Sequence, residues 1–432
     1  MQTLTIDPAV EQFLAQFRPG SANGHAAPWQ EAGRQALLKQ PFPTRKTEAW
    51  KYTDLKPLLK RSYRLSAALP AADPVAWAIP GLDADRLVFL NGRYAPALSD
   101  LSRNGAVLEI SSLADLAGPL AEQVGELAAP DADLFAALNA AYAQEGICIR
   151  LAPGKAAPAP LHLLYLTVPD GTELLAQTRN LILLERSADL KIVESQHTAG
   201  EGSSLRNVVT EIHVGENAGL EYIRLQQESE RAVQIDRTEI RIAADARCSV
   251  FTFTLGGELV RSSLTMRLAG PNAEAHLLGT YVLSGYQQAD HFTQVHHIAP
   301  HCFSNELYKG ILDGKSTGVF SGRIHVYPDA QKTNAYQSNR NVLLSDTANI
   351  FTRPQLEIYA DDVKCSHGAT SGRLDEQALF YLRARGIPAH EARLMLLESF
   401  AGEVSSRISI EPLRAHLEAI LAARLASLRS RA

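Results

Sequence analysis

Cysteine is scarce in this chain, and its distribution excludes two kinds of protein. The four cysteines, Cys148, Cys248, Cys302 and Cys365, lie far apart, and no two of them form a CxxC pair. A chain of 432 residues can build a large core and does not need disulfides to hold it together. We therefore expect reduced thiols, and neither a disulfide scaffold nor a paired-CxxC zinc ribbon.

The sequence also lacks long apolar runs and an excess of positive charge. Its densest apolar stretch, LHLLYLTV from Leu161, is far shorter than the roughly 18 residues that suggest a membrane span. The first residues, MQTLTIDPAVEQFL, contain Asp7 and Glu11 and no basic head, unlike a secretory signal. The formal net charge of −5 argues against nucleic acid as a partner. We expect a cytoplasmic protein with neither a membrane nor a nucleic-acid partner.

Common catalytic and nucleotide-binding motifs are missing as well. There is no GxSxG elbow, and the GKST sequence at Gly314 has its upstream glycine at Gly310 instead of five positions before it, so it is not a phosphate-binding loop. The adjacent carboxylates of Asp361 and Asp362 would point apart on a strand, which favours a solvated turn. We therefore expect no ATP on this chain, and no hydrolase signature is present.

What the sequence does contain is an ordinary globular composition arranged in several regions. Hydrophobic residues make up 46% and charged residues 21%. Apolar positions at helical spacing in VEQFLAQF and WQEAGRQALLKQ predict an N-terminal helical region over 1–85. A β-rich core is expected over 86–372, and the segment DADLFAALNAAYAQEG predicts a capped helix inserted near 131–146.

Short β-rich segments recur between residues 160 and 370, each interrupted by a small polar break. Ala188, Ala218, Ala246 and Ala273 occupy equivalent places in these breaks and are 30, 28 and 27 residues apart. A near-constant period of about 20–50 residues is typical of stacked repeats, and units made almost entirely of strand favour a β-solenoid. An irregular β-sandwich with similar turn spacing remains the alternative from the pattern alone.

The pattern changes to helix after Thr370. In LDEQALFYLRARGIP, Asp375 is available as an N-cap, while Gly386 and Pro388 are stop signals. Two further helices are predicted in AHEARLMLLESFAGEV and, after Pro412, in the remaining C-terminal sequence. We expect a C-terminal helical domain over 373–432 that caps the end of the solenoid.

The most informative stretch lies where the strands give way to the helices, and its centre is Cys365-Ser366-His367. In an extended chain the side chains at i and i+2 share a face, so this thiol and imidazole would point together. Both are suitable ligands for iron or zinc, but two ligands do not close a tetrahedral site, and a subunit interface would have to supply the rest. A buried cysteine beside a hydrogen-bonded histidine is the structural alternative.

A second cluster, HFTQVHHIAPHC, brings four histidines and a cysteine close together in the sequence. Strand alternation sends His296 and His297 to opposite faces, and the spacing matches no helical HExxH site. We therefore interpret the cluster as structural residues and not as metal ligands: His291, His296, His297, His301 and Cys302.

Two segments carry a resemblance to a known family. The run from Gln337 to Ile387, which includes QLEIYADDVKCSHGATSGRLDEQALFYLRARGI, resembles the signature region of the SufB and SufD family. RKTEAWKYTDL, from Arg45 to Leu55, is similar to the N-terminal motif of SufD proteins. Within the family, KCSHGAT at Lys364 to Thr370 resembles the SufD branch, because SufB proteins typically have a glutamate-flanked histidine there and further cysteines.

The resemblance implies a mainly β protein, with a right-handed parallel β-helix core flanked by N-terminal and C-terminal α-helical domains. It implies a non-enzymatic scaffold that helps to acquire iron and to assemble iron–sulfur clusters de novo. His367, with Cys365 beside it, would hold iron or a transient nascent cluster shared with a SufB-like subunit. A β-helix enzyme acting on polysaccharide is the alternative, although it would be expected to show a secretory signal and clustered catalytic acids.

The resemblance also implies a second partner, a SufC-like ATPase of the ABC type, and allows a homodimer when the chain is alone. The C-terminal helices would contact the ATPase and couple its ATP hydrolysis to the shared interface. Trp50 is interpreted as a local core aromatic and not as a partner-facing anchor. For the ATPase contact that the resemblance implies, apolar positions at helical spacing offer six anchors: Leu379, Phe380, Leu382, Leu394, Leu397 and Phe400. Ordinary packing within the chain is the alternative for each of these residues.

Overall fold

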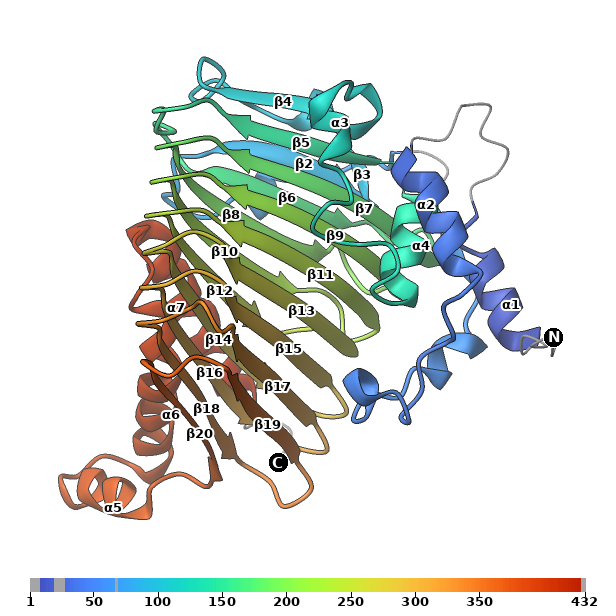
Figure 1. Ribbon diagram of the computed structural model, residues 1–432. Coiled ribbons are helices and arrows are strands. Elements are labelled where there is room, and N and C mark those ends of the chain that lie inside the picture. The colour runs from blue at the N-terminus through green and yellow to red at the C-terminus, as the bar shows by residue number, and fades with distance from the viewer. Residues whose placement is uncertain (1–7, 19–27, 67–68, 144, 429–432) are drawn as a thin grey trace.

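The computed structural model describes residues 8–18, 28–66, 69–143 and 145–428. Its centre is a parallel β-solenoid made of two ten-stranded sheets, which lie face to face (Figure 1). From β5 onward, each strand pairs in parallel with the strand two further along the chain, so the chain alternates between the sheets. The expected β-helix is confirmed, and the sandwich alternative is wrong.

Most odd-numbered strands form one sheet, called the odd sheet, and most even-numbered strands form the other, called the even sheet. The exceptions are β4, which lies in the odd sheet, and β3, which lies in the even sheet. The odd sheet contains β19 (Asn349–Ile358), β17 (Thr317–Val326), β15 (Gln288–His297), β13 (Leu259–Leu268), β11 (Ala232–Ile242), β9 (Ser204–Val214), β7 (Glu173–Leu184), β5 (Glu145–Leu151) and β4 (Leu108–Ser112), with β1 (Tyr63–Leu65) beside β7. The even sheet contains β20 (Lys364–Gly372), β18 (Asn334–Leu343), β16 (Phe303–Leu312), β14 (Glu274–Leu283), β12 (Arg247–Thr254), β10 (Gly219–Gln227), β8 (Asp189–Thr198), β6 (Leu161–Thr167), β2 (Asp85–Leu90) and β3 (Arg93–Tyr94).

The polar breaks seen in the sequence are the turns that lead into the even strands. Each of the four equivalent alanines is buried just before such a strand, and the register stacks these strands in order. The residue before each alanine has a positive φ, which small polar residues such as asparagine tolerate better than most. These residues are Ser187, Asn217, Asp245 and Asn272, with φ of 57°, 55°, 58° and 59°. The repeat period predicted from the sequence is confirmed.

The main core fills the lumen between the two sheets. Alternation along each strand sends every second side chain inward, so Ile192, Tyr222, Val250 and Leu277 stack on successive even strands and are almost fully buried. Full burial of one aliphatic side chain of this kind stabilises the fold by about 1.5–3 kcal/mol. Stacked inward rows of this kind hold the coils together.

The C-terminal helices cover the outer face of the even sheet. Helices α6 (Ala389–Ser405) and α7 (Glu411–Ser427) run beside that face (Figure 1) and bury Leu397, Leu413 and Leu417 against Ile223 and Phe253. The expectation that these helices cap the end of the solenoid is therefore wrong. Their apolar residues pack instead against apolar side chains on the outer face of the even sheet.

A shorter helix, α5 (Glu376–Ala384), joins the solenoid to α6. The predicted N-cap is confirmed, since the Asp375 carboxylate accepts hydrogen bonds from the backbone N–H groups of Gln377 and Ala378 at 2.8 and 3.2 Å. After the helix, Gly386 has a φ of 86°, as a helix stop requires.

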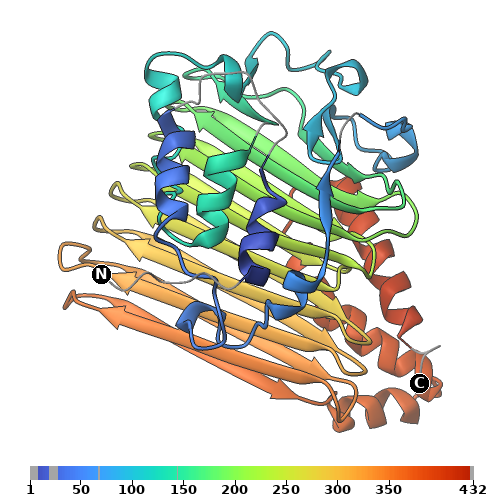
Figure 2. The same ribbon diagram turned by 90° about the vertical axis from the view of Figure 1, so that its right-hand side faces the viewer.

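The N-terminal segments cover the outer face of the odd sheet (Figure 2). The helices here are α1 (Pro8–Ala15), α2 (Pro28–Leu37) and α4 (Leu134–Tyr142), of which α4 is the predicted inserted helix. Trp50 is 4% exposed and packs against Phe135, with its ring centroid 5.6 Å away, so it is a local core residue as expected. The smaller elements are α3 (Pro119–Glu122), η1 (Glu48–Trp50), η2 (Lys56–Lys60), η3 (Pro74–Trp77), η4 (Pro96–Leu98) and η5 (Leu113–Asp115).

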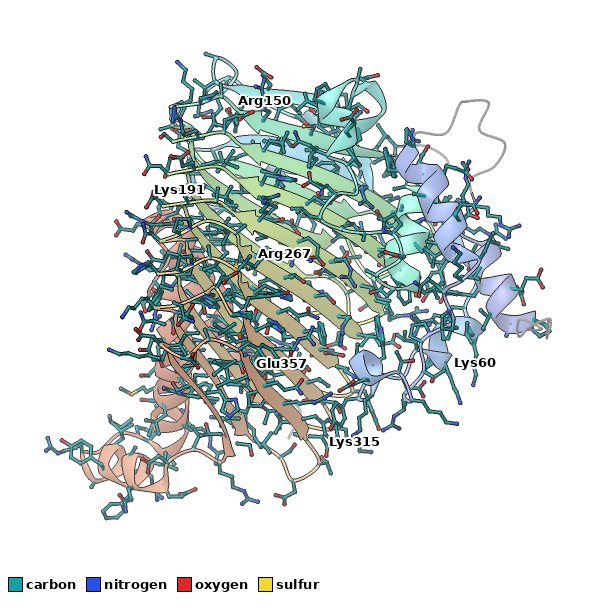
Figure 3. All side chains as sticks on the ribbon, viewed as in Figure 1. Lys60, Arg150, Lys191, Arg267, Lys315 and Glu357 are labelled. Atoms are coloured by element: carbon teal, nitrogen blue, oxygen red, sulfur yellow. The ribbon has the colours of Figure 1, made fainter. Side chains whose placement is uncertain are left out.

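Both sets of helices share apolar cores with the sheets they cover. The division at residues 85 and 372 stays a prediction, although β2 begins at Asp85 and β20 ends at Gly372. Some residues of the predicted regions lie outside the described residues: 1–7, 19–27 and 67–68 of the N-terminal region, 144 of the insertion and 429–432 of the C-terminal domain. Charged side chains are spread along the solenoid, from Arg150 in its first part to Glu357 in its last odd strand (Figure 3). Within the described ranges, none of the helices has the length and apolar character of a membrane span.

Candidate functional site

The solenoid ends open at β19 and β20. Each of these strands is the last in its sheet, so each has one edge with no partner strand among the described residues. At the other end, β3 and β4 pair in antiparallel fashion with β2 and β5. An exposed strand edge presents unpaired N–H and C=O groups to a further strand. The open end is therefore a surface that can accept another chain.

Cys365 and His367 both lie on β20 and project toward the lumen side. The register places Cys365 beside Ala335 and His367 beside Gln337, two buried residues of β18. Cys365 is half-buried against the lumen core, whereas His367 is exposed. The structure thus brings the predicted pair to one face, as the i, i+2 spacing indicated.

The surroundings of Cys365 favour its thiol over the thiolate. Burial raises its pKa above the usual range, although the backbone N–H of Ala335 lowers it in part. A bound metal ion favours the thiolate and would reverse this preference. In the described part of the chain, no group of three histidine, cysteine or acidic residues is arranged to hold a metal ion, so this pair is at most part of a site.

Directly behind His367, the lumen contains polar residues that the sequence analysis did not single out. The Gln337 amide donates a hydrogen bond from Nε2 to Glu306 Oε2 at 2.6 Å. Burial raises the pKa of Glu306 to about 7, while the neighbouring Thr293 hydroxyl and the Gln337 amide each lower it. The solenoid period could have revealed Gln337 and Glu306. Gln337 lies one coil before His367 and Glu306 two coils before it, in the same inward row.

The histidine cluster is divided between the two faces of β15, as predicted. His291 and His297 face the lumen, where burial lowers the pKa of each to about 4 and keeps the rings neutral. His297 Nε2 lies 2.8 Å from Ser304 Oγ, and the His291 ring centroid is 5.1 Å from that of Tyr281. The contact of His297 is that of a structural histidine, whereas neither ring nitrogen of His291 has a hydrogen-bond partner among the described residues.

Two further members of the cluster, His301 and Cys302, lie in a turn. His301 has a φ of 62°, and Cys302 follows it in the buried position that alanine occupies in earlier coils. The Cys302 thiol is 3.3 Å from the carbonyl oxygen of Gly270. Cys302 is therefore a small packing residue of the solenoid turn.

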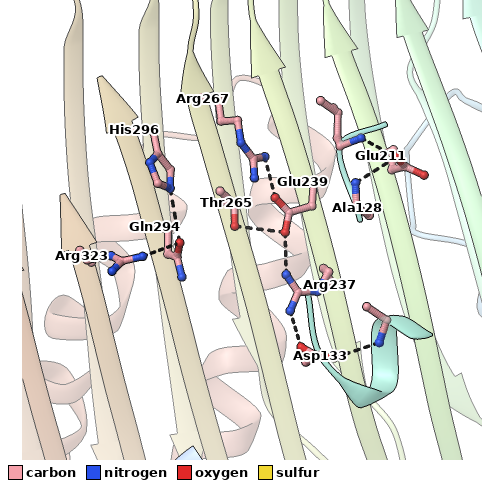
Figure 4. Close-up of polar contacts among 12 residues, drawn as sticks. Ala128, Asp133, Glu211, Arg237, Glu239, Thr265, Arg267, Gln294, His296 and Arg323 are labelled. Atoms are coloured by element: carbon pink, nitrogen blue, oxygen red, sulfur yellow. Dashed lines mark hydrogen bonds and ion pairs between the residues drawn. The ribbon is translucent and has the colours of Figure 1, made fainter. Parts of the chain in front are cut away.

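His296 lies on the outer face of the odd sheet, within the polar layer drawn in Figure 4. Its Nε2 is 3.4 Å from Gln294 Oε1, to which Arg323 also donates at 3.1 Å. Burial lowers the pKa of His296 to about 4, and the nearby arginines Arg267 and Arg323 add to this effect. A neutral ring among cations is poorly placed to attract another cation.

The same polar layer attaches α4 to the sheet (Figure 4). Arg237 and Arg267 both donate to the Glu239 carboxylate, at 2.8 and 2.7 Å, and Arg237 also pairs with Asp133, the N-cap of α4. Although burial raises the pKa of Asp133, the Arg237 guanidinium holds that pKa below its usual range. This network explains why the inserted helix lies firmly on the odd sheet.

The six residues predicted to contact an ATPase differ in exposure. Leu379 and Leu397 are buried within the chain, while Phe380 is 71% exposed. The side chains of Leu382, Leu394 and Phe400 are half-buried. Exposed neighbours that the sequence reasoning missed are Tyr381 and Met395, at 57% and 47%. Adjacent exposed aromatic residues at Phe380 and Tyr381 were the signal that could have revealed this patch.

Two motifs set aside in the sequence analysis are turns between strands. GKST connects β16 to β17, with Gly314 at a φ of 64° and its carbonyl oxygen accepting a hydrogen bond from Ser345 Oγ at 2.7 Å. Asp361 and Asp362 lie between β19 and β20, where Asp362 pairs with Lys332. Both motifs therefore serve the geometry of the coils.

Family models match most of the chain. The model described as the SufBD core domain of the SUF system for FeS cluster assembly matches residues 167–400. A second model, the SufBD protein N-terminal region, matches residues 24–163. The chain belongs to the SufB/SufD family. The role of this family is iron–sulfur cluster assembly, and the open strand β20 lies within its core domain.

Individual relatives agree with the family match. The chain is 34% identical over 395 residues to the iron–sulfur cluster assembly protein SufD of Escherichia coli, which covers 90% of this chain and 91% of the relative. It is 33% identical over 396 residues to an iron–sulfur cluster assembly SufBD family protein of Synechocystis, covering 89% and 87% of the two chains. SufD of Bacillus subtilis is 25% identical over 398 residues, covering 89% and 90%. Membership of the family leaves the polysaccharide-active enzyme without support.

Proposed function

We propose that this chain is a non-enzymatic scaffold subunit that assembles iron–sulfur clusters at an interface with a SufB-like subunit. The observation that carries the proposal is the position of Cys365 and His367 on β20. They lie on one face of an edge strand at the open end of the solenoid, within the matched core domain. Ligands placed there are available to a second chain and to the metal at the same time.

Iron or the nascent cluster is the cargo of this site. A thiolate and an imidazole are both suitable ligands for iron, and a tetrahedral metal centre needs further ligands beyond two. A SufB-like partner seated on the open end supplies the remainder in this proposal. Release of the cluster is then easier than from a closed site, because separating the two chains removes part of the ligand set.

The edges of β19 and β20 support the SufB-like partner as the neighbour at the open end. An added strand pairs with unsatisfied backbone groups there, and exposed apolar side chains at Phe351, Ile358 and Tyr359 stand beside those edges. The same edges would allow two copies of this chain to pair when no partner is present. The homodimer is therefore part of the proposal for the isolated chain.

A SufC-like ATPase is proposed to bind around α5 and the start of α6. Phe380 and Tyr381 stand out from α5, and Met395 lies on α6. Helix α6 also holds the even sheet, because Lys309 Nζ donates to the Phe400 carbonyl oxygen at 2.9 Å. A pull on α5 and α6 would thus reach the sheet that ends in β20.

Co-expression with a SufB-like subunit and a SufC-like ATPase tests the proposal. We expect the three chains to purify as a stable complex that forms iron–sulfur clusters when supplied with iron, a sulfur source and ATP. Failure of the chain to purify with either partner would contradict it. Removing 373–432 is a poor test of the ATPase contact, since it exposes the apolar side of the even sheet. Point substitutions on α5 are cleaner.

A further inference from the structure

One inward-facing row of the even sheet changes character as it approaches the open end. Val250 and Leu277 occupy this row on β12 and β14, and both are completely buried apolar residues. The next three strands, β16, β18 and β20, place Glu306, Gln337 and His367 in the same row. Polar residues therefore occupy this row on the last three strands. The exposed His367 is the outermost of them, and Gln337 and Glu306 lie behind it.

The first two polar residues of this row are joined in a defined orientation. Glu306 and Gln337 are 1% and 3% exposed, and Gln337 Nε2 donates to Glu306 Oε2 at 2.6 Å. A carboxylate can only accept hydrogen bonds, so it attracts the NH2 group of the amide and turns the carbonyl oxygen away. Among the described residues, Gln337 Oε1 has no hydrogen-bond partner, although it is shielded from solvent. Buried acceptors normally have a donor.

His367 is the residue in register that can supply this donor. Neighbouring strands lie about 4.7–4.9 Å apart, and residues in register on one face have adjacent side chains. A neutral imidazole carries one N–H group, and the hydrogen bond made by one ring nitrogen decides which nitrogen is left bare. Metal-binding histidines are commonly held in this manner by an outer partner.

We propose that Gln337, aimed by Glu306, is a positioning residue that accepts the ring N–H of His367 and leaves the other ring nitrogen bare toward the open end. This inference rests on the proposed function, in which that bare nitrogen binds iron or the nascent cluster. Gln337 itself does not touch the metal. It sets the tautomer and the direction of the ring before the cargo arrives.

The tautomer of His367 can be measured in the full-length chain without metal. Ring-15N-labelled histidine gives nitrogen–hydrogen correlation spectra at about pH 8.5, where the free imidazole is neutral. The His367 signal is the one that disappears in His367→Gln. We expect a single dominant tautomer in the unsubstituted chain and a mixture of both in Gln337→Leu.

Two further substitutions make the test specific: one replaces Glu306 by a residue of the same shape, and the other changes a neighbour of Gln337. In Glu306→Gln the new amide can both donate and accept, so it no longer orients Gln337, and the mixture of tautomers should appear there too. Ser338→Ala changes the next residue of β18, on the opposite face of the sheet, and should keep the single tautomer. Equal thermal midpoints for the variants would show that folding is intact.

The same mixture in the unsubstituted chain and in Gln337→Leu would overturn the inference, as would a mixture in Ser338→Ala. The proposed function is judged separately, by cluster formation in the complex with His367→Ala. If that variant loses cluster formation while Gln337→Leu leaves the tautomer unchanged, only the role of Gln337 is wrong. If the tautomer depends on Gln337 but His367→Ala still forms clusters, the function assigned to His367 is wrong.

Discussion

At the scale of single residues, the exposure of His367 makes its replacement informative. The side chain is exposed and lies on an edge strand, so His367→Ala should leave the fold intact. We expect it to reduce cluster formation by the complex by at least about tenfold, because a metal site that loses a ligand binds its metal less tightly. Cluster formation is followed by the visible absorption of the purified complex.

A matched control is available on α6. His390 is also exposed, with 59% of its side chain accessible, and it lies outside the open end of the solenoid. His390→Ala should form clusters as the unsubstituted complex does. Equal loss in both histidine variants would contradict a specific role for His367.

The second residue-scale prediction concerns Glu306 and pH. Its pKa is about 7 in the fold, against an ordinary value of 4.5, so between these pH values the folded chain holds a proton that the unfolded chain releases. Stability should therefore fall as the pH rises through that window, by up to about 3 kcal/mol for this group. Glu306→Gln removes this titration. The change in the free energy of unfolding that the substitution causes should therefore be more favourable at pH 8 than at pH 5.

Urea denaturation of both chains at the two pH values measures this difference. Comparing the variant with the unsubstituted chain cancels the titration of all other groups, provided that they are unperturbed. A stability difference that does not change with pH would show that Glu306 is not a buried carboxyl with a raised pKa.

At the scale of elements, α5 contains both a residue that is available to a partner and a residue that packs within the chain. Phe380 is 71% exposed on this helix, whereas Leu379 beside it is buried. Phe380→Ala should weaken binding of the SufC-like ATPase by about 2 kcal/mol, as expected for an aromatic anchor, and should barely change the thermal midpoint. Isothermal titration calorimetry with the purified ATPase measures the affinity.

Val75 provides the comparison for this prediction. It is 66% exposed in η3, outside the C-terminal helices, so Val75→Ala removes exposed apolar surface without touching α5. ATPase binding should be the same in this variant as in the unsubstituted chain. Normal affinity in Phe380→Ala would remove α5 from the proposed interface.

At the scale of the whole molecule, the shared core predicts that the helices and the solenoid unfold together. Leu417 of α7 is completely buried in the cluster that also contains Ile223 and Phe253 of the even sheet. Leu417→Ala should cost about 2–5 kcal/mol and lower the melting temperature. Tryptophan fluorescence follows the N-terminal part of the chain, because the three tryptophans are Trp29, Trp50 and Trp77. Helical circular dichroism reports mainly on the C-terminal helices, because α6 and α7, with 17 residues each, are longer than α1, α2 and α4.

We expect both signals to shift by the same amount in Leu417→Ala. Repeat proteins can also unfold from one end, because each coil contacts only its neighbours. Loss of the helical signal at a lower temperature than the fluorescence change would therefore show that the C-terminal helices form a separate unit. In that case the shared core is too weak to couple them to the sheets.

Much of the architecture could be predicted from local patterns. Ala188, Ala218, Ala246 and Ala273 reveal the solenoid because each coil repeats the same backbone geometry and needs a small residue at the same turn. The cap at Asp375 and the shared face of Cys365 and His367 follow from the periods of helix and strand. These features depend on residues that are near each other in the sequence.

Contacts between distant segments were decided only by the tertiary structure. The sequence showed that the C-terminal helices have apolar faces, but their place on the side of the even sheet depends on the apolar surface that the coils create together. Leu397 is buried for that reason, while Phe380, with similar helical spacing, is exposed. Likewise, the repeat period places Gln337 about one coil and Glu306 about two coils before His367, but the exact register that puts all three in one row is fixed by stacking of the coils.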